Sequence, residues 1–547
     1  MYITRTPSKR ASGKTYYCTL LRESYREGGK IKNRTIANLS NCSENEIAAI
    51  KLALAHKDNP KALEGAPLKL VAGRKIGAAY VLSELTKRLG IAEAVGDSFQ
   101  GKLALFQTIV RVLEQGSRLS ATRVAQSHDI VSVIGLKRGF DENDLYTNLQ
   151  WLSERQSKIE DVLFKKRGGR PSLFLYDVTS SYFEGTENEL ANYGYNRDGK
   201  KRRKQIVVGL LCDQEGNPVS VQVFEGNTQD VETFIFQVHK VIERFDCSNV
   251  TFVGDRGMIK NAQIEEVEKH HCQYVTALTM PQFEKLLKDG TLNLESFVPE
   301  LNEVILENVR YVFRKNPARA AETMATRMER LAKAEEKVKS QNEHLANSSK
   351  AKLRSAKKDI QKWLKKLFLD EWVKLENDRR HLRLEIDEGA LAEKSRLDGC
   401  YVYKTNLCAK EYSPQTVFER YKDLALVEWA FRTCKTTHLD LRPIYVRTAD
   451  NTRGHVFIVM LAYMLVKELS QAWKEINLTV EEGLDALACI SRTDAHLPNG
   501  QTIAYILSPD EISKRLLDEL RIKPPASIEE SPARVVSRCK VRESANI

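Results

Sequence analysis

Cysteine is scarce in this sequence, which has ten cysteines among 547 residues. None forms a Cys-x-x-Cys pair, and none clusters with the spacing of metal ligands. This scarcity argues against a disulfide framework and against a structural zinc site. Free thiols fit a reducing compartment, so we expect a cytoplasmic protein.

Long apolar runs are also missing. The longest, VFIVMLAYMLV from Val456 to Val466, has 11 residues, whereas a membrane span needs about 20. It predicts a buried helix. The first residues, MYITRTPSKRASGK, lack the apolar stretch of a signal peptide. We therefore expect neither a membrane partner nor export.

Positive charge is in excess. The chain has 85 Lys and Arg against 73 Asp and Glu, a net charge of +12, with 42% hydrophobic residues. That apolar content supports a sizeable core and excludes wholesale disorder. The length suggests three or four domains, or one large core with insertions. The charge favours a polyanionic partner, with nucleic acid as the first candidate.

The densest positive charge lies in a β-rich segment, residues 1–75. Between Met1 and Ser40 there are nine Lys or Arg residues against two Glu. KTYYCTLLRESYR and KIKNRTIANL alternate apolar and polar residues around Gly28-Gly29, which predicts a basic β-hairpin. A solvated small sheet and a DNA contact are both open interpretations of it.

Residues 76–165 change to a helical period. Apolar residues recur three and four apart in IGAAYVLSELTKRLGI, KLALFQTIVRVLEQ and NDLYTNLQWLSERQSKIEDVLF. We expect a helical domain there, and we assign it to DNA binding together with the basic segment before it.

Residues 171–280 predict the first part of an α/β catalytic core. Three short apolar segments, LFLYDVT, IVVGLLCD and VSVQVFEG, predict a meander of strands. VTFVGD and YVTALT then alternate with helical segments. This is the element order of a ribonuclease H-like fold, with a mixed five-stranded sheet and helices. Residues 413–490 would complete that core.

The core is interrupted over residues 281–412, where we expect an insertion domain. Between Lys315 and Lys366 there are 15 Lys or Arg residues against six acids, with few Gly or Pro. This predicts a basic hairpin of two long helices that bends near Ser348-Ser349, either simply solvated or in contact with DNA. Residues 491–547 are expected to form a C-terminal region and a flexible tail, which we expect from Ile522 onwards.

Two carboxylates stand where predicted strands end. Asp177 follows the apolar LFLY, and Asp255 follows VTFVG. An ionised carboxylate beside a buried strand is costly unless a cation offsets it. Two such acids on central strands of one sheet would converge, and Mg²⁺ or Mn²⁺ is the natural compensation because these ions take oxygen ligands.

A third acid, Glu428, lies on a predicted helix. Tyr421, Glu428 and Lys435 are spaced seven apart, so one continuous helix would carry all three on one face. A carboxylate for a metal ion with a nearby Lys suits a phosphodiester, because the Lys can contact a neighbouring phosphate.

These segments resemble a known family. LYDVTSSYFEG, GDRGM and the Tyr421–Lys435 helix, in this order, resemble the DDE transposases of bacterial insertion sequences, in the group marked by Tyr-x2-Arg-x3-Glu-x6-Lys. YGYNRDGKKRRKQIVVGLL, PVSVQVFEGNTQD and the opening MYITRTPSKRASGKTYY resemble the same family. The resemblance spans most of residues 1–470.

The resemblance implies roles for individual residues. Asp177, Asp255 and Glu428 would be the catalytic, metal-binding acids, with Tyr421 and Lys435 flanking the glutamate as DNA-binding residues. The family Arg falls on Leu424, and Arg432 or Arg420 would substitute for it. The gap of 173 residues between the second and third acids implies an insertion domain, which agrees with the irregular basic stretch.

Further cations are candidates for phosphate contact. They are Arg256, next to the second acid, and the basic run before the second core strand, which comprises Lys200, Lys201, Arg202, Arg203 and Lys204. A solvated turn is the alternative for the run. His455 is a weaker candidate, and Asn227 and Asp230 are typical of turn and helix-cap residues.

The sequence therefore predicts a transposase that binds the terminal inverted repeats of its element, cuts the DNA and joins it to a target. The resemblance implies two Mg²⁺ ions per active site, replaceable by Mn²⁺, double-stranded DNA as partner, and a homodimer or larger assembly in the bacterial cytoplasm, at the nucleoid. The alternatives are a catalytically silent DNA-binding protein derived from a transposase and a plain ribonuclease H-like nuclease.

Overall fold

The structure is a computed structural model of the chain. It describes residues 1–9, 15–58, 69–185, 187–195, 197, 199, 202–435, 439–441, 444–496 and 502–537. The chain divides into two compact units. The first comprises residues 1–80, 126–129 and 483–530, and the second comprises residues 81–125, 130–482 and 531–547.

The chain begins with a three-stranded antiparallel sheet, in the order β1-β2-β3. Its elements, with the helix that follows, are β1 (Tyr2–Lys9), β2 (Thr15–Glu27), β3 (Lys30–Asn38) and α1 (Glu44–Ala55). Gly28 and Gly29 both have positive φ, at 57° and 77°, which is the backbone of a two-residue hairpin turn. A third strand, β1, thus joins the expected hairpin. Ser43 and Glu46 form a capping box that starts α1.

Helices follow, most of them in the second unit. They are α2 (Gly77–Arg88), α3 (Ile91–Val95), α4 (Phe99–Leu113), α5 (Arg118–Ser127), α6 (Ile130–Val133) and α7 (Glu142–Lys166). α4 and α7 pack against α16 (Ala449–Ala472), which contains the longest apolar run. α16 is long and apolar enough to cross a membrane, but 78% of its most apolar stretch is buried inside the protein. It is the central helix of a core.

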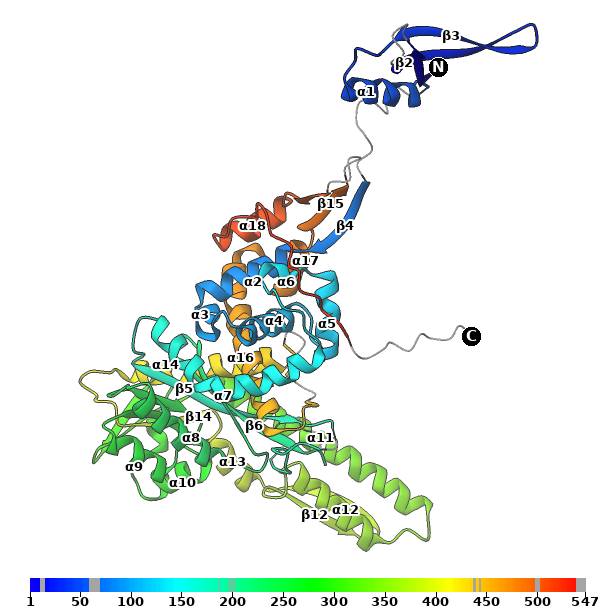
Figure 1. Cartoon of the computed structure of the whole chain (residues 1–547). Helices are drawn as coiled ribbons and strands as arrows, with labels where there is room; N and C mark the ends of the chain where they lie inside the picture. Colours follow the sequence, from blue (N-terminus) through cyan, green and yellow to red (C-terminus); the bar gives the residue numbers. More distant parts are fainter. Residues whose placement is uncertain are drawn as a thin grey trace. The chain divides into compact units, whose positions relative to one another are not determined.

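The largest sheet has eight strands, in the order β10-β11-β14-β9-β8-β5-β6-β7. Three of them, β5, β6 and β14, are labelled in Figure 1. Its first five in sequence are β5 (Leu173–Tyr182), β6 (Gln205–Asp213), β7 (Pro218–Phe224), β8 (Thr251–Gly254) and β9 (Gln273–Ala277). β5, β6 and β7 form an antiparallel meander, and β8 runs parallel to β5 and β9. These five strands have the order predicted for a ribonuclease H-like core.

The sheet has more strands than the five that the sequence predicted. β10 (Asn302–Leu306), β11 (Val309–Lys315) and β14 (Cys400–Thr405) extend the sheet from β9. β14 pairs antiparallel with β9, with Tyr403 opposite Ala277. Without β14, β9 would be an edge strand with unpaired backbone N–H and C=O groups. Pairing with β14 provides hydrogen-bond partners for these groups. The insertion therefore begins and ends as part of the core sheet.

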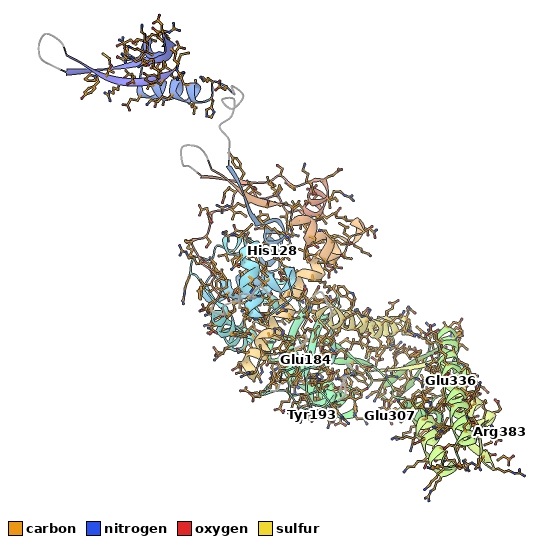
Figure 2. The ribbon with its side chains drawn as sticks, turned by 90° about the vertical axis from the view of Figure 1, so that its right-hand side faces the viewer. His128, Glu184, Tyr193, Glu307, Glu336 and Arg383 are labelled. Atoms are coloured by element: carbon orange, nitrogen blue, oxygen red, sulfur yellow. The ribbon has the colours of Figure 1, made fainter. Side chains whose placement is uncertain are left out.

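Residues 331–391 form a hydrophobic core of their own, whereas Phe283 packs with Tyr311 and Phe313 of β11 in a separate cluster. Both clusters draw on the rest of the insertion. Its elements are α10 (Met280–Lys288), η3 (Leu294–Ser296), α11 (Pro317–Asn347), α12 (Leu353–Lys366), β12 (Val373–Asp378), β13 (His381–Ile386) and α13 (Glu388–Arg396). α11 packs against α12 and β13. Figure 2 labels Glu336 on α11 and Arg383 on β13. Leu331, Ile360 and Trp372 are buried between them. These buried apolar side chains thus hold the basic hairpin of α11 and α12 in place.

The predicted glutamate helix is two helices. α14 (Pro414–Lys422) ends at the cap residue Asp423, and α15 (Leu424–Lys435) begins directly after it. Tyr421 and Glu428 therefore lie on different helices, and the argument from seven-residue spacing on one continuous helix is wrong. After α16 the chain forms η4 (Lys474–Ile476) and α17 (Val480–Leu487).

The C-terminal region contains regular elements before the predicted tail. β15 (Ser491–His496) pairs with β16 (Thr502–Ile506) and with β4 (Lys69–Lys75), and α18 (Glu511–Glu519) follows. Beyond them, Phe140 exchanges backbone hydrogen bonds with Arg534 (3.2 Å) and Val536 (3.1 Å). Ser531 donates its amide to the Ser132 hydroxyl at 3.1 Å. The scarcity of apolar periodicity concealed this segment, because backbone atoms make these contacts.

Candidate active site

Asp177 lies in the middle of β5, the sixth strand in the order of the large sheet. Four buried residues precede it, and its own side chain is half-buried. β5 lies between β6 and β8; Asp177 pairs with Leu210 of β6, and the pairing with β8 ends one residue earlier, at Tyr176 and Gly254. One carboxylate oxygen, Oδ1, accepts a hydrogen bond of 2.7 Å from the amide of Val178.

Asp255 follows the last residue of β8, the strand parallel to β5. Its side chain is exposed. Oδ1 accepts hydrogen bonds from the Arg256 amide (2.7 Å) and the Tyr421 hydroxyl (3.1 Å). Burial, and next the nearby Asp255 charge, raise the pKa of Tyr421 well above its usual range, so this phenol stays protonated. Tyr421 can therefore act as a donor that orients Asp255.

Glu428 comes from α15, which packs against β5. One side of this helix is buried through Leu424, Val427 and Phe431, whereas Glu428 is exposed. Asp177, Asp255 and Glu428 all line one cleft of about 810 Å³. The structure thus brings the three predicted acids, separated by up to 251 positions in sequence, to the wall of one cavity.

The three acids influence one another electrostatically. Burial raises the pKa of Asp177 to about 7, with the Val178 amide and Arg197 acting in the lowering direction and the charges of Asp255 and Glu428 in the raising direction. The oxygens of the three carboxylates do not all lie within 4.8 Å of one another.

The donor set fits a hard divalent cation. All three side chains offer carboxylate oxygens, which are the ligands that Mg²⁺ and Mn²⁺ prefer. A cation would also offset the burial and repulsion that oppose ionisation of Asp177. The residues that the cleft presents are therefore chemically suited to the ions that the sequence predicted.

Arg197 is a functional candidate that the sequence reasoning missed. Its guanidinium contacts both oxygens of Asp230, at 2.6 and 2.5 Å, and its charge lowers the pKa of Asp177. Asp230 is the first residue of α8 (Asp230–His239), so it is an ion-pair partner and not simply a cap. Arg197 sits within YGYNRDGKK, a stretch that was noted for its resemblance and not for this side chain.

The cleft also carries cations. Arg256 and Lys422 line it, as do Arg314 and Arg319 from the strand and helix of the insertion. Only Arg256 among these was predicted. Lys422 is the last residue of α14, whereas Arg314 and Arg319 come from β11 and α11. The approach of these two arginines to the acids depends on the pairing of the insertion strands with the sheet, which the sequence pattern did not reveal.

Several predicted cations lie away from this cleft. Lys435, half-buried at the end of α15, and exposed Arg432 are not among its lining residues. Arg202, Arg203 and Lys204 precede β6 and do not line it either. Lys200 and Lys201 lie outside the described residues. Leu424, at the family Arg position, is buried but does line the cleft.

His455 and Asn227 also lie elsewhere. His455 is buried in α16, where Nδ1 accepts from Arg118 at 3.1 Å and Nε2 donates to the Leu441 carbonyl at 3.2 Å. Burial, Arg111 and Arg118 hold its pKa well below the usual range, so it stays neutral. Asn227 is exposed in the turn after β7, as expected of a turn residue.

The fold is α/β, and one cleft beside its large sheet is lined by both carboxylates and cations. This arrangement is typical of an enzyme that acts on a polyanionic substrate. The particular family follows from comparison. The chain belongs to the transposase DDE domain family, whose model matches residues 168–465, more than half of its length. Residues 3–65 match the IS1634 family transposase N-terminal domain. The protein is therefore a DDE transposase of the insertion-sequence type.

Solved structures show a weaker likeness. The cryo-EM structure of the piggyBac transposase synaptic complex with hairpin DNA is 10% identical, with a TM-score of 0.38, and the match covers 71% of this chain and 69% of that chain. The Mos1 transposase paired-end complex with the left transposon end is 12% identical, with a TM-score of 0.15, and the match covers 31% and 57%. No curated protein matches the chain.

Proposed function

We propose that this transposase binds the terminal inverted repeats of its own element, cuts the DNA at the ends and transfers the cut strands to target DNA. The observation that carries this proposal is the single cleft lined by Asp177, Asp255 and Glu428, with cations on its rim. The acids suit divalent cations, and Arg256, Lys422 and Arg319 suit the phosphates of a DNA strand.

Asp177, Asp255 and Glu428 would hold two Mg²⁺ ions, for which Mn²⁺ could substitute. Such ions would supply activation of water or of a 3′-hydroxyl and stabilisation of the leaving 3′ oxygen. The protein itself aligns the ligands: the Tyr421 hydroxyl and the Arg256 amide hold one oxygen of Asp255. The rim cations position the phosphodiester, and no covalent enzyme intermediate is needed.

The partners are double-stranded DNA ends and target DNA, engaged by a homodimer or a larger assembly, because two ends must be brought together. We place this reaction at the nucleoid in the bacterial cytoplasm. The basic sheet of residues 1–58 and the helices up to residue 165 would recognise the ends, and the hairpin of α11 and α12 would add backbone contacts.

The direct test uses a DNA fragment that carries the gene and its flanking sequences, incubated with the full chain and Mg²⁺. Cleavage at the outer boundaries of matching inverted repeats is expected. Binding without any cleavage would favour the silent DNA-binding alternative. Cleavage without regard to the ends would favour a plain nuclease. Either result would overturn the proposal.

Divalent ions should stabilise the folded chain. An ion that binds only the native carboxylates raises the free energy of unfolding, by about 2.7 kcal/mol when its concentration is 100 times its Kd. We expect Mg²⁺ or Mn²⁺ to raise the Tm of the wild type and to have a much smaller effect on Asp177→Asn. An equal shift in both proteins would show that the ion binds elsewhere. Thermal unfolding in matched ionic strength measures this.

Lys435 is proposed to contact a phosphate near the scissile bond. Lys435→Ala should slow cleavage about tenfold or more, the equivalent of one charge-assisted hydrogen bond, while the Mg²⁺-dependent rise in Tm persists. Lys435→Arg should recover part of the rate because the charge is retained. Cleavage kinetics measure this, with the exposed Lys410→Ala as control.

Two results would contradict that role for Lys435. If it contributes only to a surface ion pair, alanine should cost at most about 1 kcal/mol of stability and leave cleavage unchanged. Full rescue of Lys435→Ala by additional Mn²⁺ would instead assign Lys435 to the organisation of the metal ions.

A further inference from the structure

A second group of metal-ligating side chains lies on the two helices that cover the core sheet. His239 is the last residue of α8, and Glu266 and His270 come from α9 (Asn261–Lys269) and its cap. Glu266 and His270 are four residues apart, which places them on one helix face. Among the residues that the structure describes, these three form the one group of His, Cys, Asp or Glu whose ligand atoms all lie within 4.8 Å of one another.

The two imidazoles converge on a single carboxylate oxygen. Nε2 of His239 lies 2.9 Å from Oε1 of Glu266, and Nε2 of His270 lies 3.1 Å from the same atom. Zn²⁺ binds imidazole nitrogen and carboxylate oxygen at 2.0–2.2 Å, so its ligand atoms are separated by about 3.3 Å in a tetrahedron. A small outward movement of these side chains would make room for the ion.

The helices hold the three side chains in place. Phe234 and Val238 of α8 and Ile264 and Val267 of α9 are buried in the core beneath the sheet. Gln263 of α9 also donates to the Val231 carbonyl of α8 at 3.4 Å. The ligands therefore stand on a packed support, while their side chains, 22 to 41% exposed, remain open to solvent.

Charge at the site favours a cation. Glu266 places a carboxylate oxygen, which carries negative charge when ionised, between the two imidazole nitrogens. The competing cation is Lys269, whose Nζ lies 3.7 Å from Oε1, but its side chain is 70% exposed and can move into solvent. An ionised carboxylate only accepts hydrogen bonds, so each Nε2 currently carries a hydrogen. Metal binding at Nε2 requires that hydrogen to leave this nitrogen, for Nδ1 or for solvent.

We propose that His239, Glu266 and His270 bind a borderline transition-metal ion, Zn²⁺ in particular, which clips α8 to α9 and leaves a fourth position for water. Imidazole ligands distinguish this site from the all-carboxylate cleft, because Mg²⁺ prefers oxygen ligands. The cysteine pattern gave no sign of it, since its ligands are histidines and a glutamate from separate helices. The site would be structural: α8 carries Asp230, the partner of Arg197, and α9 follows the Asp255 loop.

The test measures zinc bound to the full chain. Protein stripped with a chelator, then given ZnCl₂ and desalted, is compared with His239→Gln, His270→Gln and the matched control His271→Gln, an exposed neighbour outside the cluster. We expect the wild type and His271→Gln to retain one more Zn²⁺ per chain than the other two variants. Excess Mg²⁺ should not displace that ion, and Asp177→Asn should retain it.

Thermal unfolding provides the second readout. Zn²⁺ should raise the Tm of the wild type and His271→Gln but not of the two cluster variants, which should have similar Tm values with and without the ion. Equal zinc content in all four proteins would overturn the proposal. So would zinc lost in Asp177→Asn and kept in the cluster variants. A lower Tm in the cluster variants with no dependence on Zn²⁺ would show a simple ion-pair cluster instead.

Discussion

Asp177→Asn should reduce DNA cleavage and strand transfer by at least about 10³-fold, since loss of one electrostatic stabiliser of a transition state alone costs about 10²–10³ in kcat. Asparagine has the same size but a neutral amide, so it removes a metal ligand without filling the cleft. Asp255→Asn and Glu428→Gln should have the same effect. Binding of the DNA ends should remain within about tenfold of the wild type, because the acids repel phosphate and do not supply that affinity.

The measurement combines a cleavage rate with a binding isotherm for the same DNA. Asp289→Asn, an exposed acid at the end of α10, is the matched control and should leave both unchanged. Loss of cleavage together with loss of end binding would indicate a folding defect, which circular dichroism would detect. Near-normal transposition by any two of the three variants would refute the assignment of the acids.

Some of this site could be predicted because local patterns carry the information. An apolar run that ends in a carboxylate marks Asp177 and Asp255 as strand residues, and the order of the strands then places both on one sheet. Glu428 was predicted from the amphipathic pattern around it together with the family resemblance. The five strands from β5 to β9 could be predicted for the same reason, since each is a short apolar segment between turns.

Other features depend on long-range pairing that no local pattern specifies. β14 pairs with β9 although 122 residues separate Ala277 from Cys400, and this pairing brings the insertion, with Arg314 and Arg319, to the cleft. The ion pair of Arg197 could not be predicted from the sequence for a similar reason, because its partner Asp230 lies 33 residues away. The break at Asp423 shows the opposite failure: a favourable helical pattern continues in sequence, although α14 ends at Lys422 and α15 begins at Leu424.

The second large effect concerns DNA recognition by the N-terminal region. Removing residues 1–165 would be a poor experiment, because α4 and α7 pack against the apolar helix α16 and their loss would expose it. The basic sheet with α1 is a better target, since α1 buries none of its side chains. Deletion of residues 1–58 should remove selectivity for the ends, which for specific binders is at least about 10³-fold over other DNA.

The shortened chain should still bind DNA weakly and with strong salt dependence, through backbone phosphates. A full-length variant separates charge from folding: Arg26→Gln with Lys30→Gln removes two exposed cations beside the hairpin turn. Each lost phosphate contact should lower the slope of log K against log salt by about 0.9, and Arg26→Lys should retain the slope because the charge is kept. Titrations at several salt concentrations, with end and unrelated DNA, measure both quantities. Unchanged selectivity after deletion of residues 1–58 would place end recognition in the helices or the insertion instead.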